Sequence, residues 1–121
     1  MGKVGSIVAV AVLAVACART DAGQRLSADE LHRLVPGATL HGEVADGGTF
    51  DGTYFRDGTM AIRTEGDADT GTWEFEDDTI CLTWTKWRNG ERYCIYWRRE
   101  GEGYGSYNVD GRHSTRFTIA E

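Results

Sequence analysis

The sequence predicts an all-β domain: an antiparallel meander of eight strands that closes as a small barrel, lipocalin-like or flattened, after one short N-terminal helix. Past Gly37, apolar and polar residues alternate with a period of two, and Gly and Asp-Gly turns interrupt the alternation. Short strands joined by tight turns are antiparallel neighbours, because parallel crossovers need connections of about a dozen residues. A meander with one apolar face must close on itself to bury that face.

Length and composition fit a single domain. The chain has 121 residues, of which 40% are hydrophobic, and domains run to about 100–150 residues. The net charge of −6 argues against a nucleic-acid-binding protein, because phosphate contacts require a basic surface. We expect the domain at 27–121, after a tether at 19–26.

Residues 1–18 are predicted to be a signal peptide. Lys3 supplies a positive n-region, and 7–16 is an unbroken apolar run, shorter than the about 20 residues of a membrane span. Two interpretations of processing stay open. The small residues at 14–16 fit a cleavage site, and the same stretch followed by Cys17 resembles a lipobox. We therefore expect an exported protein, either periplasmic, secreted or an outer-membrane lipoprotein that touches the membrane only through a lipid anchor on Cys17.

The other two cysteines predict a disulfide bond. Once Cys17 is removed or acylated, Cys81 and Cys94 form an even pair in an exported chain. Their bridge would close a loop of about 14 residues, which is worth about 3 kcal/mol in the chain-entropy model. Neither cysteine belongs to a C-x-x-C pair or has a nearby histidine, so we expect no metal and no cofactor.

The helix is expected at 28–35. Ser27 and Glu30 have the spacing of a capping box, in which each side chain accepts a hydrogen bond from the other residue's backbone N–H. Leu26 and Leu31 stand where a hydrophobic staple forms, and a Pro-Gly pair ends the helix. We expect this helix to plug or cover one end of the barrel.

Turn signals divide the rest of the chain into strands at roughly 38–45, 49–55, 59–65, 70–77, 79–86, 91–99, 103–109 and 113–120. Because successive side chains of a strand point to opposite faces, the alternation predicts which residues face inward. They are Leu40, Val44, Phe50, Tyr54, Met60, Ile62, Trp73, Phe75, Leu82, Trp84, Tyr93, Ile95, Trp97, Tyr107, Val109, Phe117 and Ile119. The aromatic members either fill the core of a small barrel or line an apolar pocket at one mouth.

The disulfide also predicts the register of the fifth and sixth strands. A tight turn at Asn89-Gly90 alone would leave Cys81 four positions from the residue opposite Cys94, beyond the ~7 Å limit for a bridge. Placing the two cysteines opposite each other gives a four-residue loop at 86–89 instead.

This register puts Trp87 at the tip of a hairpin, between Lys86 and Arg88. Two interpretations are open. An exposed Trp between cations is a candidate anchor for a partner protein, a glycan or a headgroup region. The alternative is that Trp87 packs back over the end of the barrel. Lys86, Trp87 and Arg88 are the candidate binding residues.

Catalytic patterns are absent from the sequence. His32, His41 and His113 form no metal-ligand or nucleophile motif. Glu74 and Glu76 lie on an outward strand face, where both stay solvated and ionised, unlike the two carboxylates of a glycosidase. We expect no enzyme.

Other charged pairs have simple structural interpretations. Asp67 and Asp69 read as a polar turn, because calcium requires six or more oxygen ligands. Arg92 and the pair at 98–99 are expected to form ion pairs with the outward glutamates across the strands, each worth less than about 1 kcal/mol.

A set of spaced motifs resembles a family of small exported bacterial proteins of unknown function. The motifs are the G-T-W of 71–73, then Asp78, Cys81, Trp84 and Cys94, and a Y-x-x-D-G-T hairpin at 54–59. The resemblance covers about 28–120. It implies a β-rich exported domain without an assigned activity, and no catalytic residue is carried over. A short Gly-x-Trp match also looks like lipocalins.

The sequence therefore predicts a non-catalytic binding or interaction module of the cell envelope. Its partner is expected to be an envelope protein, a glycan or a small apolar ligand. An alternative is a proteinaceous inhibitor of a foreign enzyme such as a lysozyme, a class that shares the plan of lipoprotein, barrel and disulfide. A small hydrolase acting through His113 or the paired glutamates is a third hypothesis.

Overall fold

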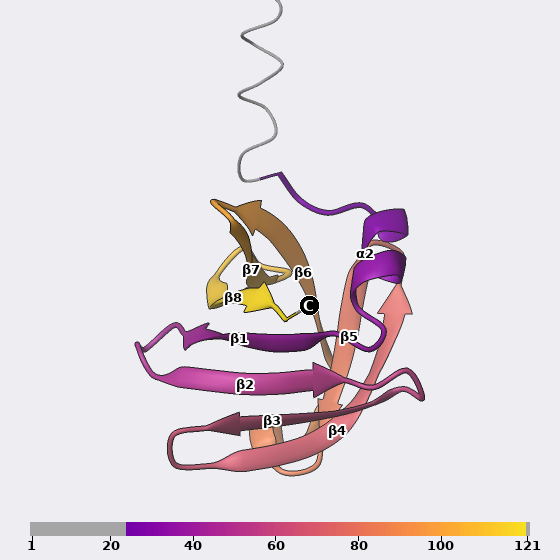
Figure 1. Cartoon of the computed structure of the whole chain (residues 1–121). Coiled ribbons are helices and arrows are strands. Elements are labelled where there is room, and N and C mark those ends of the chain that lie inside the picture. Colours follow the sequence, from indigo (N-terminus) through magenta and orange to yellow (C-terminus); the bar gives the residue numbers. More distant parts are fainter. Residues whose placement is uncertain (1–23, 121) are drawn as a thin grey trace, which may run out of the picture.

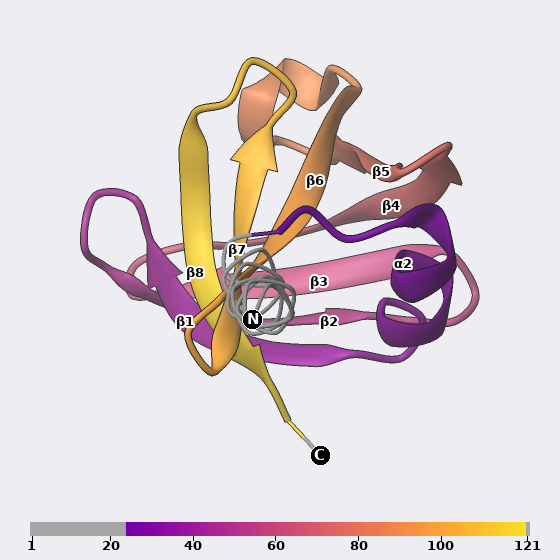
Figure 2. The same cartoon turned by 90° about the horizontal axis from the view of Figure 1, so that it is seen from above.

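The computed structural model describes residues 24–120, which form a closed antiparallel barrel with one helix at the N-terminal side (Figures 1 and 2). The elements are α2 (Ala28–Leu34), β1 (Thr39–Val44), β2 (Thr49–Tyr54), β3 (Thr59–Thr64), β4 (Ala68–Glu76), β5 (Thr79–Trp84), the 3₁₀ turn η1 (Trp87–Gly90), β6 (Tyr93–Glu100), β7 (Gly103–Asn108) and β8 (His113–Ile119). Each strand pairs with the next, and β8 pairs with β1. The predicted all-β meander and its closure are confirmed.

Helix α2 has the predicted capping box. The Glu30 backbone N–H donates to Ser27 Oγ at 3.2 Å, and the Ser27 N–H donates to Glu30 Oε1 at 2.9 Å. Leu26, Leu31 and Val35 are buried completely or almost so, and α2 covers the barrel end at which β2 and β4 finish (Figure 1). Among residues 24–120, no helix has the length and apolar character needed to cross a membrane.

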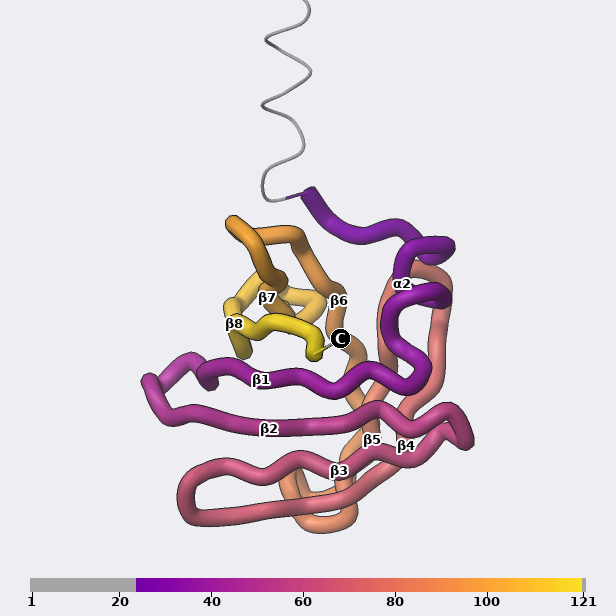
Figure 3. The backbone as a smooth tube through the Cα atoms, viewed as in Figure 1, coloured from indigo at the N-terminus to yellow at the C-terminus, as the bar shows by residue number. Residues whose placement is uncertain are grey.

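The end of the predicted tether is paired with β6 (Figure 3). The Leu26 N–H donates to the Trp97 carbonyl at 2.9 Å, and the Arg99 N–H donates to the Gln24 carbonyl at 3.0 Å. The Arg99 guanidinium binds Glu30 of α2 at 2.6 Å, so it does not pair with the outward glutamates as predicted. The rest of the predicted tether, the predicted signal peptide and Cys17 lie outside the described residues.

Most of the predicted inward set forms the core. The fully or almost fully buried members are Leu40, Phe50, Tyr54, Met60, Trp73, Leu82, Trp84, Ile95, Trp97 and Phe117. Trp97 is completely buried. Its ring packs edge-on against Phe117, with centroids 4.8 Å apart. Such edge-to-face contacts add to the burial of the rings themselves.

The prediction that Tyr107 and Val109 face inward is wrong. Tyr104 packs against the core and Ser106 is buried, so these two supply the inner face of β7. The register shifts between Ser106 and Tyr107, and Tyr107 instead stacks on Tyr96, with centroids 5.5 Å apart. Val109 is 65% exposed. Tyrosines occur on both faces of β7, so the alternation of residue types alone did not show which tyrosine points inward.

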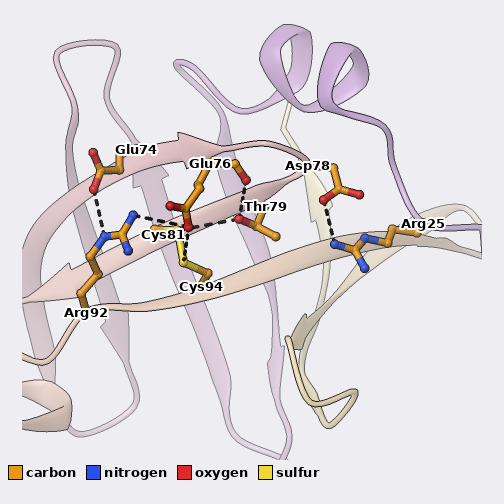
Figure 4. The surroundings of a disulfide bond; sticks show 8 residues. All are labelled: Arg25, Glu74, Glu76, Asp78, Thr79, Cys81, Arg92 and Cys94. Carbon is orange, nitrogen blue, oxygen red and sulfur yellow. Dashed lines mark hydrogen bonds and ion pairs between the residues drawn. A yellow bond between two sulfur atoms is a disulfide. The ribbon is translucent and has the colours of Figure 1, made fainter.

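The predicted disulfide and its register are both confirmed. Cys81 pairs directly with Cys94, and their sulfurs are bonded. Figure 4 shows the bridge beside Glu76, with Arg92 linking Glu76 to Glu74. The Arg92–Glu74 distance is 3.0 Å and the Arg92–Glu76 distance is 3.8 Å, so this part of the predicted ion-pair set is also observed.

Glycines allow two close approaches between strands. A Cβ at Gly42 would lie 2.0 Å from the Arg116 carbonyl oxygen, and one at Gly71 would lie 2.3 Å from the Thr83 carbonyl oxygen. Glycine inside a strand marks such a tight bend or close backbone contact. These two positions therefore allow the sheet to curl into a narrow barrel.

Candidate binding cavity

Side chains do not fill the barrel completely. A cavity of about 200 Å³ lies inside it. Its apolar lining includes Leu40, Phe50, Ile62, Leu82, Trp84 and Ile95. Its polar lining includes Tyr54, Tyr93, Thr64, Ser106, Ser114 and Thr115. The predicted aromatic residues therefore both fill the core and line a pocket. Trp73 packs in the core, and other members such as Trp84 line the cavity.

The cavity extends to the barrel end opposite α2. We call this end the mouth and residues 85–92 the mouth loop. Trp87 packs on Trp84 with ring centroids 4.8 Å apart, and it lines the cavity together with Arg88. Trp87 is thus packed back over the barrel end, which is one of the two positions left open by the sequence. The Arg88 guanidinium lies 3.6 Å from the centroid of the Tyr93 ring.

Two aspartates hold the mouth loop in this position. Asp69 Oδ2 accepts the backbone N–H groups of Lys86 and Trp87, both at 2.9 Å. Asp67 accepts Lys86 Nζ at 2.6 Å and Trp87 Nε1 at 2.9 Å. We call these four residues the aspartate latch. Asp69 is only 8% exposed and belongs to β4, so the expectation that both aspartates form a mere polar turn is wrong.

Hydrogen bonds keep the latch aspartates ionised. The Lys86 ammonium, the Trp87 indole N–H and the Ala68 backbone N–H lower the pKa of Asp67 to about 2. Burial by itself raises the pKa of Asp69, but backbone N–H groups of Trp87 and Lys86 outweigh it and the pKa is lowered. Asp67 in turn raises the pKa of Lys86. Both aspartates and Lys86 are therefore charged at neutral pH.

Hydrogen bonding inside the barrel is incomplete. The Trp84 indole N–H donates to the Tyr93 hydroxyl at 2.9 Å, and the hydroxyls of Ser106 and Thr115 bond each other at 2.6 Å. The Trp97 indole N–H is buried without a partner in the described part of the chain. A buried donor without an acceptor carries a desolvation penalty of about 1–3 kcal/mol.

The histidines lie elsewhere. His41 bonds Asp51 on the outer face of β1 and β2, and His32 packs its ring 4.2 Å from Phe75. His113 packs against a tyrosine ring. Within residues 24–120, no histidine lines the cavity.

One cluster near the disulfide has metal-binding residue types. Ligand atoms of Glu76, Cys81 and Cys94 lie within 4.8 Å of one another. Both sulfurs are joined in the disulfide, so neither is available as a thiolate ligand.

In comparisons with known proteins, no family model, no curated protein and no solved structure matches the chain. The resemblance to small exported bacterial proteins stays a prediction. Function is therefore argued from the cavity and the mouth loop.

Proposed function

We propose that this protein is a non-catalytic binding module that holds a small, mostly apolar ligand inside its barrel. The observation that carries the proposal is the cavity of about 200 Å³, which runs from the aromatic interior to the mouth. An engineered apolar cavity of about 150 Å³ is known to bind benzene. The space therefore suits a single ring or a short chain rather than a long lipid.

The three candidate binding residues have separate roles in this proposal. Trp87 covers the mouth, Lys86 fastens the loop through Asp67, and Arg88 places a cation at the rim. Arg88 and Asn89 have φ near 55°, a left-handed conformation that is uncommon for residues other than glycine. We expect this loop to move when a ligand enters or leaves.

The alternative of an enzyme inhibitor has less support. An inhibitor that blocks a foreign active site needs a side chain that projects from the barrel. Trp87 instead contacts Trp84 and is partly buried against the core. Ligand binding is therefore the function that the geometry supports best.

A substitution that fills the mouth tests the proposal. Val44 lines the cavity, whereas its neighbour Glu43 is exposed on the opposite strand face. We expect wild type to bind toluene saturably in calorimetric titration. Val44→Phe should weaken binding by about tenfold or more, which is about 1.4 kcal/mol.

The matched control is Glu43→Phe, which adds the same ring outside the barrel and should leave the toluene affinity unchanged. Absence of toluene binding by wild type, or equal loss in both variants, would contradict the proposed function.

The proposal includes export to the cell envelope, either as a lipoprotein or by simple secretion. Two features support export. The chain starts with a positively charged residue followed by an apolar run, and a disulfide such as Cys81–Cys94 persists in oxidising compartments. Intact mass of protein isolated from the native envelope tests it. We expect a chain shortened at its N-terminus, with a diacylglyceryl adduct if Cys17 is acylated. A full-length chain beginning at Met1 would contradict export.

A further inference from the structure

Two tyrosine hydroxyls of the cavity are hydrogen-bond donors without an acceptor in the part of the chain that the structure describes. Tyr54 is 3% exposed and lines the cavity, and its hydroxyl bonds none of the described residues. The Tyr93 hydroxyl accepts from Trp84 Nε1, and its own proton has no acceptor within residues 24–120. A molecule with an acceptor oxygen would complete these bonds.

The four tryptophans provide an internal comparison. The indole N–H groups of Trp73, Trp84 and Trp87 donate to the Phe55 carbonyl, the Tyr93 hydroxyl and Asp67, each at 2.9 Å. Among the described residues, only the Trp97 indole has no acceptor. Buried polar groups are normally paired, and an exception calls for an explanation such as a bound molecule. Trp97 lines the same cavity as Tyr54 and Tyr93.

The acceptor is expected to be neutral. Burial, with a smaller effect of nearby Tyr93, raises the pKa of Tyr54 above its ordinary value, so this hydroxyl keeps its proton and remains a neutral donor. Burying a carboxylate needs a paired cation as well as hydrogen bonds. The cation that lines the cavity, Arg88, sits at the mouth on the Tyr93 ring.

We infer that the natural ligand is a small apolar carbonyl compound whose oxygen accepts hydrogen bonds from the Tyr54 and Tyr93 hydroxyls. This inference rests on the proposed function and names its ligand class. The hydrocarbon part would contact the apolar wall that contains Phe50, Leu82 and Trp84.

Three probes of equal size test the ligand class. Acetophenone carries the carbonyl, α-methylstyrene replaces its oxygen by CH₂, and benzoate carries an anion. In calorimetric titrations of wild type we expect acetophenone to bind about tenfold tighter than α-methylstyrene, which corresponds to about 1.4 kcal/mol. Benzoate should bind more weakly than acetophenone.

Tyr54→Phe should reduce the preference for acetophenone, because the Tyr93 hydroxyl is then the one remaining donor of the pair. It should leave the α-methylstyrene affinity unchanged, because the lost hydroxyl bonds no residue among 24–120. The control is Tyr107→Phe, which removes a hydroxyl that bonds Glu100 outside the cavity and should keep the preference. Thermal unfolding of each variant confirms that it is folded.

The outcomes separate the two proposals. Equal binding of acetophenone and α-methylstyrene by wild type, or a preference that is undiminished in Tyr54→Phe, overturns the ligand class but leaves the binding function intact. Tightest binding of benzoate also overturns it and favours an anion held by Arg88. If none of the probes binds, the proposed function fails as well.

Discussion

The two ends of the barrel are closed by different interactions. At one end, α2 and the segment before it bury Leu26, Leu31 and Val35 with at most 1% exposure. At the mouth, Lys86 and Asp67 hold the loop while their side chains stay 56% and 49% exposed. Hydrophobic burial is worth about 1.5–3 kcal/mol for each large side chain, whereas exposed ion pairs contribute little. The helix end is therefore closed by the stronger interactions, and we expect the mouth to be the end that opens.

The largest expected effect lies at the helix end. Leu31→Ala removes a fully buried side chain and should lower the free energy of unfolding by about 2–5 kcal/mol. Urea denaturation followed by tryptophan fluorescence measures this change. Leu31 does not line the cavity, so the folded fraction should bind toluene with wild-type affinity.

Leu34→Ala is the matched control, because Leu34 lies in the same helix and is only partly buried. It should have a clearly smaller effect. Equal destabilisation by both variants would contradict the conclusion that burial at this end accounts for the loss, because Ala is itself the stronger helix former.

Local patterns explain why the helix end was predictable from the sequence. The capping box lies within four consecutive residues, and the two staple positions, Leu26 and Leu31, are five positions apart in the chain. The Cys81–Cys94 register followed from the geometric limit on a disulfide. In each case the interacting residues are near in sequence or covalently joined, so spacing alone carries the information.

The mouth was less predictable because its contacts are distant in sequence. Asp69 and Trp87 are 18 residues apart, and Asp67 and Trp87 are 20 apart. Their meeting depends on how β4 pairs with β5 and where the mouth loop then turns. The sequence therefore left the position of Trp87 open and missed the aspartate latch. A D-x-D motif opposite a Lys-Trp pair is the signal that could have found it.

The smallest expected effect is a pH-dependent release of the mouth loop. The pKa of Asp67 is lowered to about 2 in the folded protein, against about 3.9 for an unperturbed aspartate. Its contribution to stability is therefore complete above about pH 4 and is lost as the pH falls through 2. We expect the ¹⁵N–¹H resonance of the Trp87 indole to stay constant from neutral pH down to about pH 4 and to shift below it.

Trp73 supplies the internal reference for this titration. Its indole N–H bonds a backbone carbonyl, so its resonance should stay constant for as long as the barrel remains folded. In Asp67→Asn the acid transition of Trp87 should disappear, because the amide does not titrate. A Trp87 transition that persists in this variant would show that another group controls the mouth loop. The contrast between the apolar helix end and the charged mouth would then have to be explained by a different carboxylate.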